Sequence, residues 1–501
     1  MAQNYLDRII SYLNPRAGAQ RENFRQLQDF LQKRRYEAAG MGKRTKGWRT
    51  SSTGPNAEIE GGLRALRNRS RDLVRNNPHA ARAVKLIAGN TIGTGIVPQA
   101  APGKDIDRAW RNWGETLQCD ASGLLNFYGL QDLMMQSMVE GGECLIRRRI
   151  RVSDKSLDVP LQLEILEGDF IDDTKNEELA GGGFIWNGIE FDAKGRRAAY
   201  WLYQTHPGES RSFINSLESV RVPASEIIHL FRQDRLNQVR GVPWGAPCLI
   251  KLREFHEYDD AQLVRQKVSA AFAIFVRDTD QSVNQAPESP LDGDKVNPGG
   301  IHMLPPGKSI EFASPPTVGA DYEPYAKISL RAVAAGFGVT YEALTQDYSN
   351  VNFSSGRMGW MEFNREIEKY RWLLLIPRVC DGIWDWFLEA AKLSGYRISK
   401  DDLRPKWTPP RREMIDPVKE TNAAIRAVRA GIKTLSDVIR ENGVDPLTHF
   451  EELKADNAII DKLGLKLDSD ARTTNLSGGF QVSNDKDENQ NLDESGDDED
   501  D

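Results

Sequence analysis

The spacing of apolar residues changes twice along this 501-residue chain, and that change limits the fold class more than any other sequence feature. Over Leu63–Ile87 apolar residues recur at every third or fourth position, which predicts helices. Over Leu161–Phe231 short apolar segments alternate with polar neighbours between turn residues, which predicts strands. Helical spacing returns over residues 246–276 and again in the aromatic segment 358–414. Because helices and strands occupy separate blocks, the pattern predicts an α+β fold.

Turn and capping residues divide these blocks into expected elements. Asn77-Pro78 combines an N-cap residue with a first-turn proline, so one helix should end and the next begin there. Pro377 should interrupt or kink the long helix of residues 358–414. The expected strands are Leu161–Ile165, Phe184–Phe191, Ala199–Tyr203 and Glu226–Phe231, and further helices are expected around Trp110 and Trp113 and over Leu124–Glu140.

Charge is distributed unevenly along the chain. Residues 1–75 hold sixteen Lys or Arg and seven Asp or Glu, whereas residues 485–501 hold ten acids and one Lys. These biases predict a flexible basic N-terminal arm over residues 1–60 and a disordered acidic tail over residues 468–501. The net charge of -7 disfavours tight binding of duplex DNA, because that binding depends on Lys and Arg replacing counterions at phosphates. If DNA is a partner, we expect it to be passed rather than held.

The sequence also limits where the protein can act. Apolar segments are too short for a membrane span, so no membrane partner is expected. The first residues lack the apolar region of a secretory signal, which favours assembly in the cytoplasm. The cysteines are scattered without a C-x-x-C pair, which predicts buried free thiols rather than disulfides or a zinc site. They are Cys119, Cys144, Cys248 and Cys380.

The motifs that identify many enzymes and cofactor sites do not occur in this chain. It has no G-x-x-x-x-G-K-[ST] phosphate-binding loop and no G-x-S-x-G nucleophile turn. Gly93-Thr94-Gly95 lacks the third glycine of a dinucleotide-binding turn, and the six histidines have no metal-binding spacing. We therefore expect no catalytic residues, no metal and no cofactor.

Two charged features leave alternatives open. The acidic pairs Asp172-Asp173 and Asp259-Asp260 could hold Mg²⁺ with ligands from other elements, but solvated surface carboxylates are the favoured interpretation. One face of the first helix carries a row of arginines, namely Arg64, Arg67, Arg71 and Arg75. We expect this row to be solvated; the alternative is a docking face for an acidic neighbour.

Three segments form a recognisable series along the chain. They are Arg69–Pro78 leading to Gly93–Ile96, then Ala334–Thr345 followed by Asp347–Ser349 and Phe353–Ser355, and finally Asp416–Glu420 with Gly431–Leu435. In this order they resemble the lambda-type family of phage portal proteins. The similarity covers about residues 60–465, so the basic arm and the acidic tail fall outside it. The resemblance implies a structural protein of the virion, assembled as a closed ring of usually twelve subunits at one capsid vertex.

The resemblance also implies how the chain is organised. The portal fold combines a mixed α/β wing, a helical stem, a small clip and a helical crown, and is assembled as a ring. On this plan the wing covers residues 61–245, the first stem helix 246–276, the clip 277–318, the second stem helix 319–338, the tunnel loop region 339–357, a long kinked helix returning to the wing 358–414, and a crown-like helical unit 415–467.

The polar segment 345–357 resembles the loop that faces the DNA channel in this family. The residues expected to line the channel are Gln346, Asp347, Tyr348, Ser349, Asn350, Asn352, Ser354 and Ser355. Asp347 is the only charged residue between Gln346 and Ser355, so such a loop could touch a moving duplex without gripping its phosphates.

The function implied by the resemblance is a channel through which genomic DNA is packaged and later ejected, and which joins head to tail. The implied partners are the terminase large subunit, head-completion or tail-connector proteins, the major capsid or scaffolding protein, and double-stranded DNA bound without sequence specificity. Another capsid or head-tail structural protein is an alternative. A metal-dependent nuclease with a scattered carboxylate site is a less favoured one.

Overall fold

The computed structural model of the protein describes most of the chain between residues 52 and 467. The described residues are 12–17, 19–21, 23–24, 43, 45–47, 52–99, 104–209, 218–270, 274–278, 308–312, 322–399, 404–411, 414–465, 467 and 472. The chain divides into two units, Met1–Glu58 and Ile59–Asp501. Most of the expected basic arm, most of the expected clip and nearly all of the expected acidic tail lie outside the described residues.

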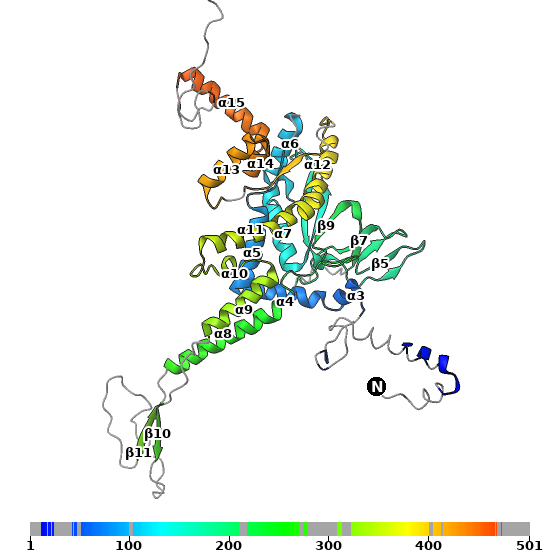
Figure 1. Cartoon of the computed structure of the whole chain (residues 1–501). Coiled ribbons are helices and arrows are strands. Elements are labelled where there is room, and N and C mark those ends of the chain that lie inside the picture. Colours follow the sequence, from blue (N-terminus) through cyan, green and yellow to red (C-terminus); the bar gives the residue numbers. More distant parts are fainter. Residues whose placement is uncertain are drawn as a thin grey trace, which may run out of the picture. The chain divides into compact units, whose positions relative to one another are not determined.

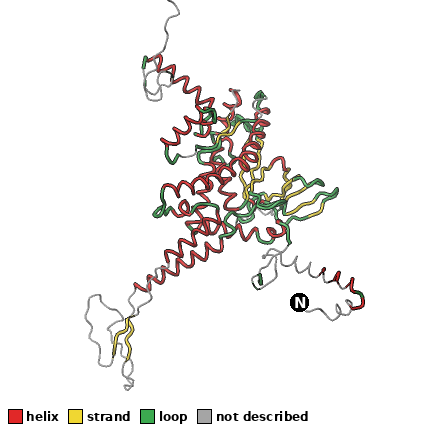
Figure 2. The backbone as a smooth tube through the Cα atoms, viewed as in Figure 1, coloured by secondary structure: helices red, strands yellow, loops and turns green. Residues whose placement is uncertain are grey.

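The described elements mix helices and strands, as the sequence predicts (Figures 1 and 2). The helices are α3 Pro55–Glu60, α4 Leu63–Asn76, α5 Pro78–Ile92, α6 Lys104–Gly114, η2 Leu117–Cys119, α7 Phe127–Gly141, η3 Gly168–Phe170, η4 Ala224–Glu226, α8 Leu249–Ala270, α9 Tyr322–Phe337, α10 Tyr341–Thr345, α11 Phe353–Tyr370, η5 Arg371–Cys380, α12 Asp381–Leu393, α13 Pro417–Arg429, α14 Leu435–Glu441 and α15 Pro446–Leu463. The strands are β1 Val97–Gln99, β2 Glu143–Ile150, β3 Leu161–Glu167, β4 Glu177–Glu178, β5 Phe184–Trp186, β6 Ile189–Phe191, β7 Arg197–Tyr203, β8 Ser219–Pro223, β9 Ile227–Phe231, β10 Ile274–Asp278, β11 Lys308–Phe312 and β12 Lys406–Thr408.

Local capping sets several helix boundaries. Asn77 ends α4 and caps α5, accepting hydrogen bonds from the backbone of His79 and Ala80, and Pro78 occupies the first turn. Gly93 ends α5 with a φ of 53°, a conformation that favours glycine. The boundary predicted at Asn77-Pro78 is therefore confirmed.

Eight of the described strands form two larger sheets in the first half of the larger unit, and the other four pair as β1-β12 and β10-β11. One sheet has the order β3-β2-β9 and the other β4-β5-β6-β7-β8, and all their described pairings are antiparallel. The expected single strand Phe184–Phe191 is wrong, because Asn187 and Gly188 adopt φ values of 49° and 74° and turn β5 back into β6. This Asn-Gly pair has the positive φ values of a two-residue hairpin turn.

The main core lies between helices α5, α6, α7 and α12 and one face of the β3-β2-β9 sheet. Trp110 is at its centre, with ring centroids 4.9 Å from Trp384, 5.0 Å from Phe387 and 5.1 Å from Phe127. Clustered aromatic rings of this kind bury large apolar areas. A second, smaller core forms around Leu145, where the two sheets meet.

Two helical expectations need correction. The helix predicted over residues 246–276 ends at Ala270, and Ile274–Asp278 instead pairs antiparallel with Lys308–Phe312. The β-branched Ile274 and Val276 favour a strand. The helix predicted over residues 358–414 begins earlier, at Phe353, because Asn352 and Ser355 form a capping box. It ends earlier too, at Leu393, and Lys406–Thr408 is a strand that pairs with Val97–Gln99.

Pro377 does interrupt regular α-helix, as predicted. Residues Arg371–Cys380 wind as a π-helix between α11 and α12, and the Asp381 N–H donates to the carbonyl of Ile376. Proline cannot donate the hydrogen bond that a regular α-helix needs at its position, and the wider winding accommodates this loss. Among the described helices, none is both long enough and apolar enough to cross a membrane.

Candidate functional site

The segment predicted to face a channel is an exposed loop fixed at both ends. Thr340 caps α10, and Gln346 ends it in the left-handed conformation with a φ of 59°. Asn352 then caps α11 by accepting a hydrogen bond from the Ser355 N–H at 2.8 Å. The loop between Gln346 and Asn352 therefore has defined ends on two helices, although most of its side chains are exposed.

Asp347, the only charged residue of this loop, accepts hydrogen bonds from two nearby residues of the same chain. Its carboxylate accepts hydrogen bonds from the Ser349 hydroxyl at 2.5 Å, the Ser349 N–H at 3.1 Å and the Tyr341 hydroxyl at 3.1 Å. The hydrogen bonds from Ser349, followed by that from Tyr341, hold the pKa of Asp347 below its ordinary value. The anion therefore serves to order the loop.

Six of the predicted channel residues lie in this loop, namely Gln346, Asp347, Tyr348, Ser349, Asn350 and Asn352. The other two, Ser354 and Ser355, are exposed but belong to the first turn of α11. Sequence proximity placed all eight in a loop, whereas the capping box makes the last two helical.

A buried ionic cluster, which we call the Glu143 cluster, forms a second polar site. Glu143 begins β2, and its carboxylate contacts Arg67 of α4 at 2.7 Å, His229 of β9 at 3.0 Å and the Arg240 Nε at 3.0 Å. Arg240 also donates to the carbonyls of Asn187 at 3.1 Å and Gly168 at 2.9 Å. One carboxylate therefore ties a helix to elements of both sheets.

The charges of the Glu143 cluster compensate one another. Burial alone would raise the pKa of Glu143, but Arg240, the His229 hydrogen bond and Arg67 hold it well below its ordinary value. Burial lowers the pKa of His229 to about 4, so this ring is neutral near pH 7. Paired and hydrogen-bonded buried charges of this kind organise a fold.

The row of arginines on α4 is only partly the solvated face that the sequence predicted. Arg67 is 3% exposed and contacts Glu143 and Asp169, while Arg71 contacts Asp169 at 2.6 Å and Glu167. The alternative is therefore correct for these two residues, and the acidic neighbour belongs to the same chain. Arg64 contacts Asp173 at 2.7 Å but its side chain is 65% exposed, and Arg75 is exposed, so these two are solvated as predicted.

The acidic pairs also have structural partners. Asp172 is 8% exposed and accepts hydrogen bonds from Tyr203, Ser219 and Thr174, which corrects its expected solvation. The Tyr322 hydroxyl donates to Asp259, but Asp259 and Asp260 are both exposed, as the favoured interpretation predicted.

Within the described part of the chain, three side chains approach metal-ligand geometry. They are Glu167, Asp169 and His206. Arg71 already binds both carboxylates there, so a cation would have to displace it. The four cysteines are buried free thiols, as predicted.

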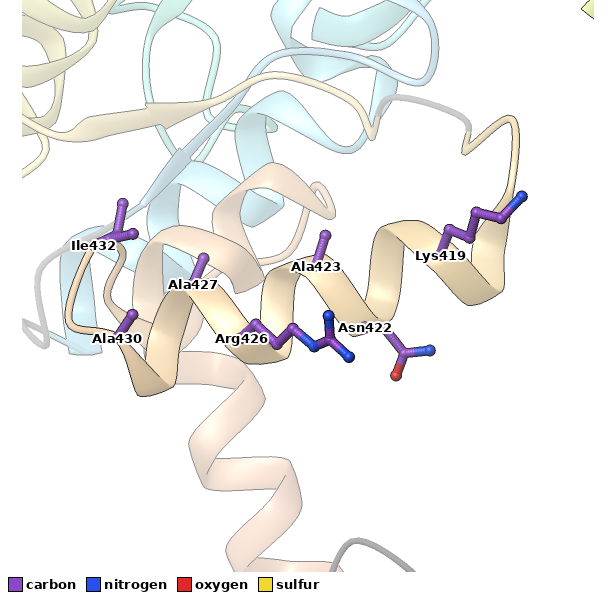
Figure 3. Close-up of a pocket in the computed structure, with 7 residues that line it drawn as sticks. All are labelled: Lys419, Asn422, Ala423, Arg426, Ala427, Ala430 and Ile432. Atoms are coloured by element: carbon purple, nitrogen blue, oxygen red, sulfur yellow. The ribbon is translucent and has the colours of Figure 1, made fainter.

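The C-terminal helices α13, α14 and α15 bury few side chains. Asp416 and Pro417 start α13 as predicted, and the described residues of α13 include no buried side chain. An open groove of about 590 Å³ runs along it (Figure 3). Its lining residues are Lys419, Asn422, Ala423, Arg426, Ala427, Ala430 and Ile432.

Sequence comparisons with known proteins agree on one family. The family described as phage portal protein, lambda family, matches residues 41–371. A probable portal protein of Halomonas phage phiHAP-1 is 26% identical over 80% of this chain and 81% of its own length. The portal protein of Escherichia phage N15 is 23% identical over 81% of this chain and 86% of its own length. A chain in the neck of an empty gene transfer agent particle aligns with a TM-score of 0.46 and 17% identity, over 79% of this chain and 100% of that chain.

With this mixed α+β fold and a family match over more than half of its length, the chain belongs to the lambda family of phage portal proteins. It is a structural component of the virion, located at the head-tail connector. Membership of this family of structural proteins excludes the metal-dependent nuclease that the sequence left as an alternative.

Proposed function

We propose that this portal protein forms a closed ring of twelve copies at one capsid vertex. Genomic double-stranded DNA passes through the ring during packaging and ejection, without sequence-specific contacts. Head-to-tail contacts between identical subunits close a ring when the rotation between neighbours divides a full turn. Family membership supports this proposal, as do the exposed apolar residues on helices that a single copy leaves uncovered.

The assignment of the channel rests on the polar, exposed side chains of the Gln346–Asn352 loop. This loop is held between two capped helices, exposes polar uncharged side chains, and satisfies its single carboxylate through Ser349 and Tyr341. Duplex DNA is held mainly through phosphate contacts with cations, and this loop offers none. A surface of this kind suits a duplex that must move. In the ring, all eight residues predicted from the sequence face the channel. Six of them lie in the loop, and Ser354 and Ser355 lie on the adjoining turn of α11.

We assign the parts of the chain on the plan that the family implies. Residues 61–245 and 358–414 form the wing, α8 and α9 the stem, residues 277–318 the clip, and residues 415–467 the crown. The clip docks the terminase large subunit during packaging and head-completion or tail-connector proteins afterwards. The major capsid or scaffolding protein surrounds the ring.

Electron microscopy of the purified full chain tests the proposal. We expect rings with a central hole of at least about 20 Å, wide enough for a duplex. Class averages with twelvefold symmetry support the proposed subunit number. Sedimentation that shows only monomer at every protein and salt concentration would overturn the ring.

A further inference from the structure

Helices α8 and α9 lie side by side and antiparallel in one copy (Figure 1). Near one end of the pair, Gly336 of α9 approaches Cys248 so closely that an added Cβ would lie 2.6 Å from the Cys248 Cβ. Toward the other end, Tyr258 of α8 packs against Tyr325 of α9 with ring centroids 4.7 Å apart. These two contacts fix which residues of α8 and α9 lie at the same level along the pair.

One exposed row on α8 combines apolar and acidic residues. Its members recur at alternating spacings of four and three, which places them on one face of the helix. They are Ile250, Glu254, Glu257, Ala261 and Val264. Ile250 is 70% exposed and Val264 is 57% exposed, so a single copy leaves the apolar ends of this row uncovered.

The exposed row on α9 has the opposite charge. Its members are Pro324, Lys327, Ile328, Arg331 and Ala335, of which Lys327 is half-buried and the others are exposed. An open groove of about 410 Å³ lies along it, lined by Glu323 and the first four of these residues. Ile328 is 62% exposed in this groove. An apolar side chain flanked by two cations fits a partner with apolar and acidic residues.

We propose that the α9 row binds the α8 row of a second copy of this chain, an inference that rests on the proposed ring. Rotation about a ring axis that runs along the helices does not change the position of a residue along that axis. Two residues at the same position along the axis in one copy therefore also lie at the same position in neighbouring copies. Glu254 lies about one and a half turns beyond Cys248, and Arg331 lies a similar distance before Gly336. Glu254 therefore faces Arg331 of the neighbouring copy.

The same register carries through both rows. Ile250 meets Ala335, Glu257 meets Ile328 with Lys327 beside it, and Ala261 meets Pro324. Each copy offers both rows, so every copy can bind one neighbour through α8 and the other through α9. A contact between two different surfaces is the kind that closes a ring.

The pairing replaces weak contacts with contacts between copies. In one copy Lys327 pairs with Glu323 at 2.6 Å and Glu257 with Arg253 at 2.9 Å, both within one helix, and all of these side chains are exposed except that of Lys327, which is half-buried. Exposed pairs of this kind contribute little to stability, so giving them up costs little. At the interface the same charges set orientation and register, because like charges placed opposite one another repel.

Charge reversal tests the pairing. Glu254→Arg and Arg331→Glu should each raise the protein concentration for half-maximal ring assembly by about tenfold or more. The double variant, in which each chain carries both changes, should assemble close to the unmodified concentration. Glu115→Arg and Lys392→Glu, exposed charges outside both rows, are the matched controls. Mass photometry measures assembly, and circular dichroism confirms that each variant folds.

Three outcomes distinguish a failure of the proposed helix pairing from a failure of the proposed ring. Single variants that assemble like the unmodified chain, or a double variant that remains impaired, would overturn the pairing and leave the proposed ring standing. An unmodified chain that forms no rings would overturn the ring and the pairing together.

Cross-linking tests the register directly. A Glu257→Cys and Ile328→Cys double variant, treated with a short bifunctional thiol reagent, should give a ladder of covalent multimers on a denaturing gel. The four native cysteines are buried and should not interfere. A Glu257→Cys and Ala335→Cys variant displaces one partner by about 10 Å along the helix and should give no ladder. Equal ladders from both variants would overturn the register.

Discussion

Arg240 forms a buried ion pair with Glu143, and its Nε atom lies 3.0 Å from both carboxylate oxygens. The Gly241 N–H is a further donor, 3.0 Å from the same carboxylate. Both side chains are almost fully buried. Because Arg240 also donates to the carbonyl of Asn187 between β5 and β6, the pair links β2 of one sheet to the turn of a hairpin in the other.

Replacement of Arg240 should test how far the fold depends on the Glu143 cluster. Arg240→Met leaves Glu143 buried with fewer counter-charges, which should lower the free energy of unfolding by about 3–5 kcal/mol. Arg221→Met is the matched control, because it breaks a similar two-point contact with Glu190 where the arginine side chain is 47% exposed. The control substitution should lower the free energy of unfolding by about 1 kcal/mol or less. Denaturant unfolding measures both, and equal losses would contradict a special role for the buried pair.

The stability of the protein should depend on pH through His229. Burial lowers its pKa from 6.5 to about 4, so the unfolded chain binds a proton at a higher pH than the folded protein does. The full stability is therefore present above pH 6.5 and should fall by about 3 kcal/mol as the pH decreases from 6.5 to 4. Because the pKa of Glu143 is also lowered in the folded protein, its protonation should reduce the stability further as the pH decreases below about 4.5.

Denaturant unfolding at a series of pH values checks this dependence. His229→Gln should flatten the decrease between pH 6.5 and 4, whereas His449→Gln on α15 should keep it. An unchanged slope in His229→Gln would assign the pH dependence to other groups.

Replacement of Asp347 should separate charge from loop order in DNA passage. Asp347→Lys puts a ring of cations in the proposed channel, so rings should form normally but package less DNA, most severely at low salt. Asp347→Asn keeps an acceptor for Ser349 and Tyr341 and removes the charge, so it should package near the unmodified level. Packaged DNA per particle is measured at several salt concentrations. Normal packaging by Asp347→Lys in confirmed rings would remove this loop from the channel.

The acidic C-terminal residues should be dispensable for assembly. About ten carboxylates per chain would gather about 120 negative charges in a twelvefold ring, and these repel one another and DNA. A chain ending after Leu467 should therefore form rings of unchanged size in electron micrographs. Loss of rings on truncation would show that the tail takes part in subunit contacts.

The native thiols should be unreactive until the protein unfolds. Burial raises the pKa of Cys119 and of Cys144 to about 12 and that of Cys248 to about 11, and it raises the pKa of Cys380 further. Only thiolates react readily with a colorimetric disulfide reagent, so the folded protein should show no fast phase at pH 8. Denaturant should expose all four thiols. A fast stoichiometric phase in the native protein would contradict their burial.

The sequence predicted what is encoded locally. Asn77 and Asp416 cap helices where expected, because an N-cap acts on backbone groups two or three residues away. The burial of Arg67 could not be predicted in this way, since its partner Glu143 lies 76 residues further along the chain. An arginine row on an amphipathic helix has the same spacing whether water or carboxylates cover it.

The position of the candidate loop was predictable, and its extent was less so. Its polar composition between two helical patterns indicated a loop, but the Asn352–Ser355 capping box starts α11 at Phe353 and makes Ser354 and Ser355 helical. The Glu143 cluster left a weaker signal, a lone acid at the start of an apolar strand, whose partners come from three other segments.

The short pairing of β1 with β12 has a consequence for synthesis of the protein. Val97–Gln99 pairs with Lys406–Thr408, and the side chain of Gln99 donates to Thr408 across 309 positions of sequence. Trp407, which packs against Trp110 and Trp384, arrives with the same strand. A ribosome therefore has to release more than four hundred residues before the aromatic core can close, and contacts of such long range are slow to form. Until then the nascent chain presents part of its apolar core to chaperones and to other nascent copies of itself.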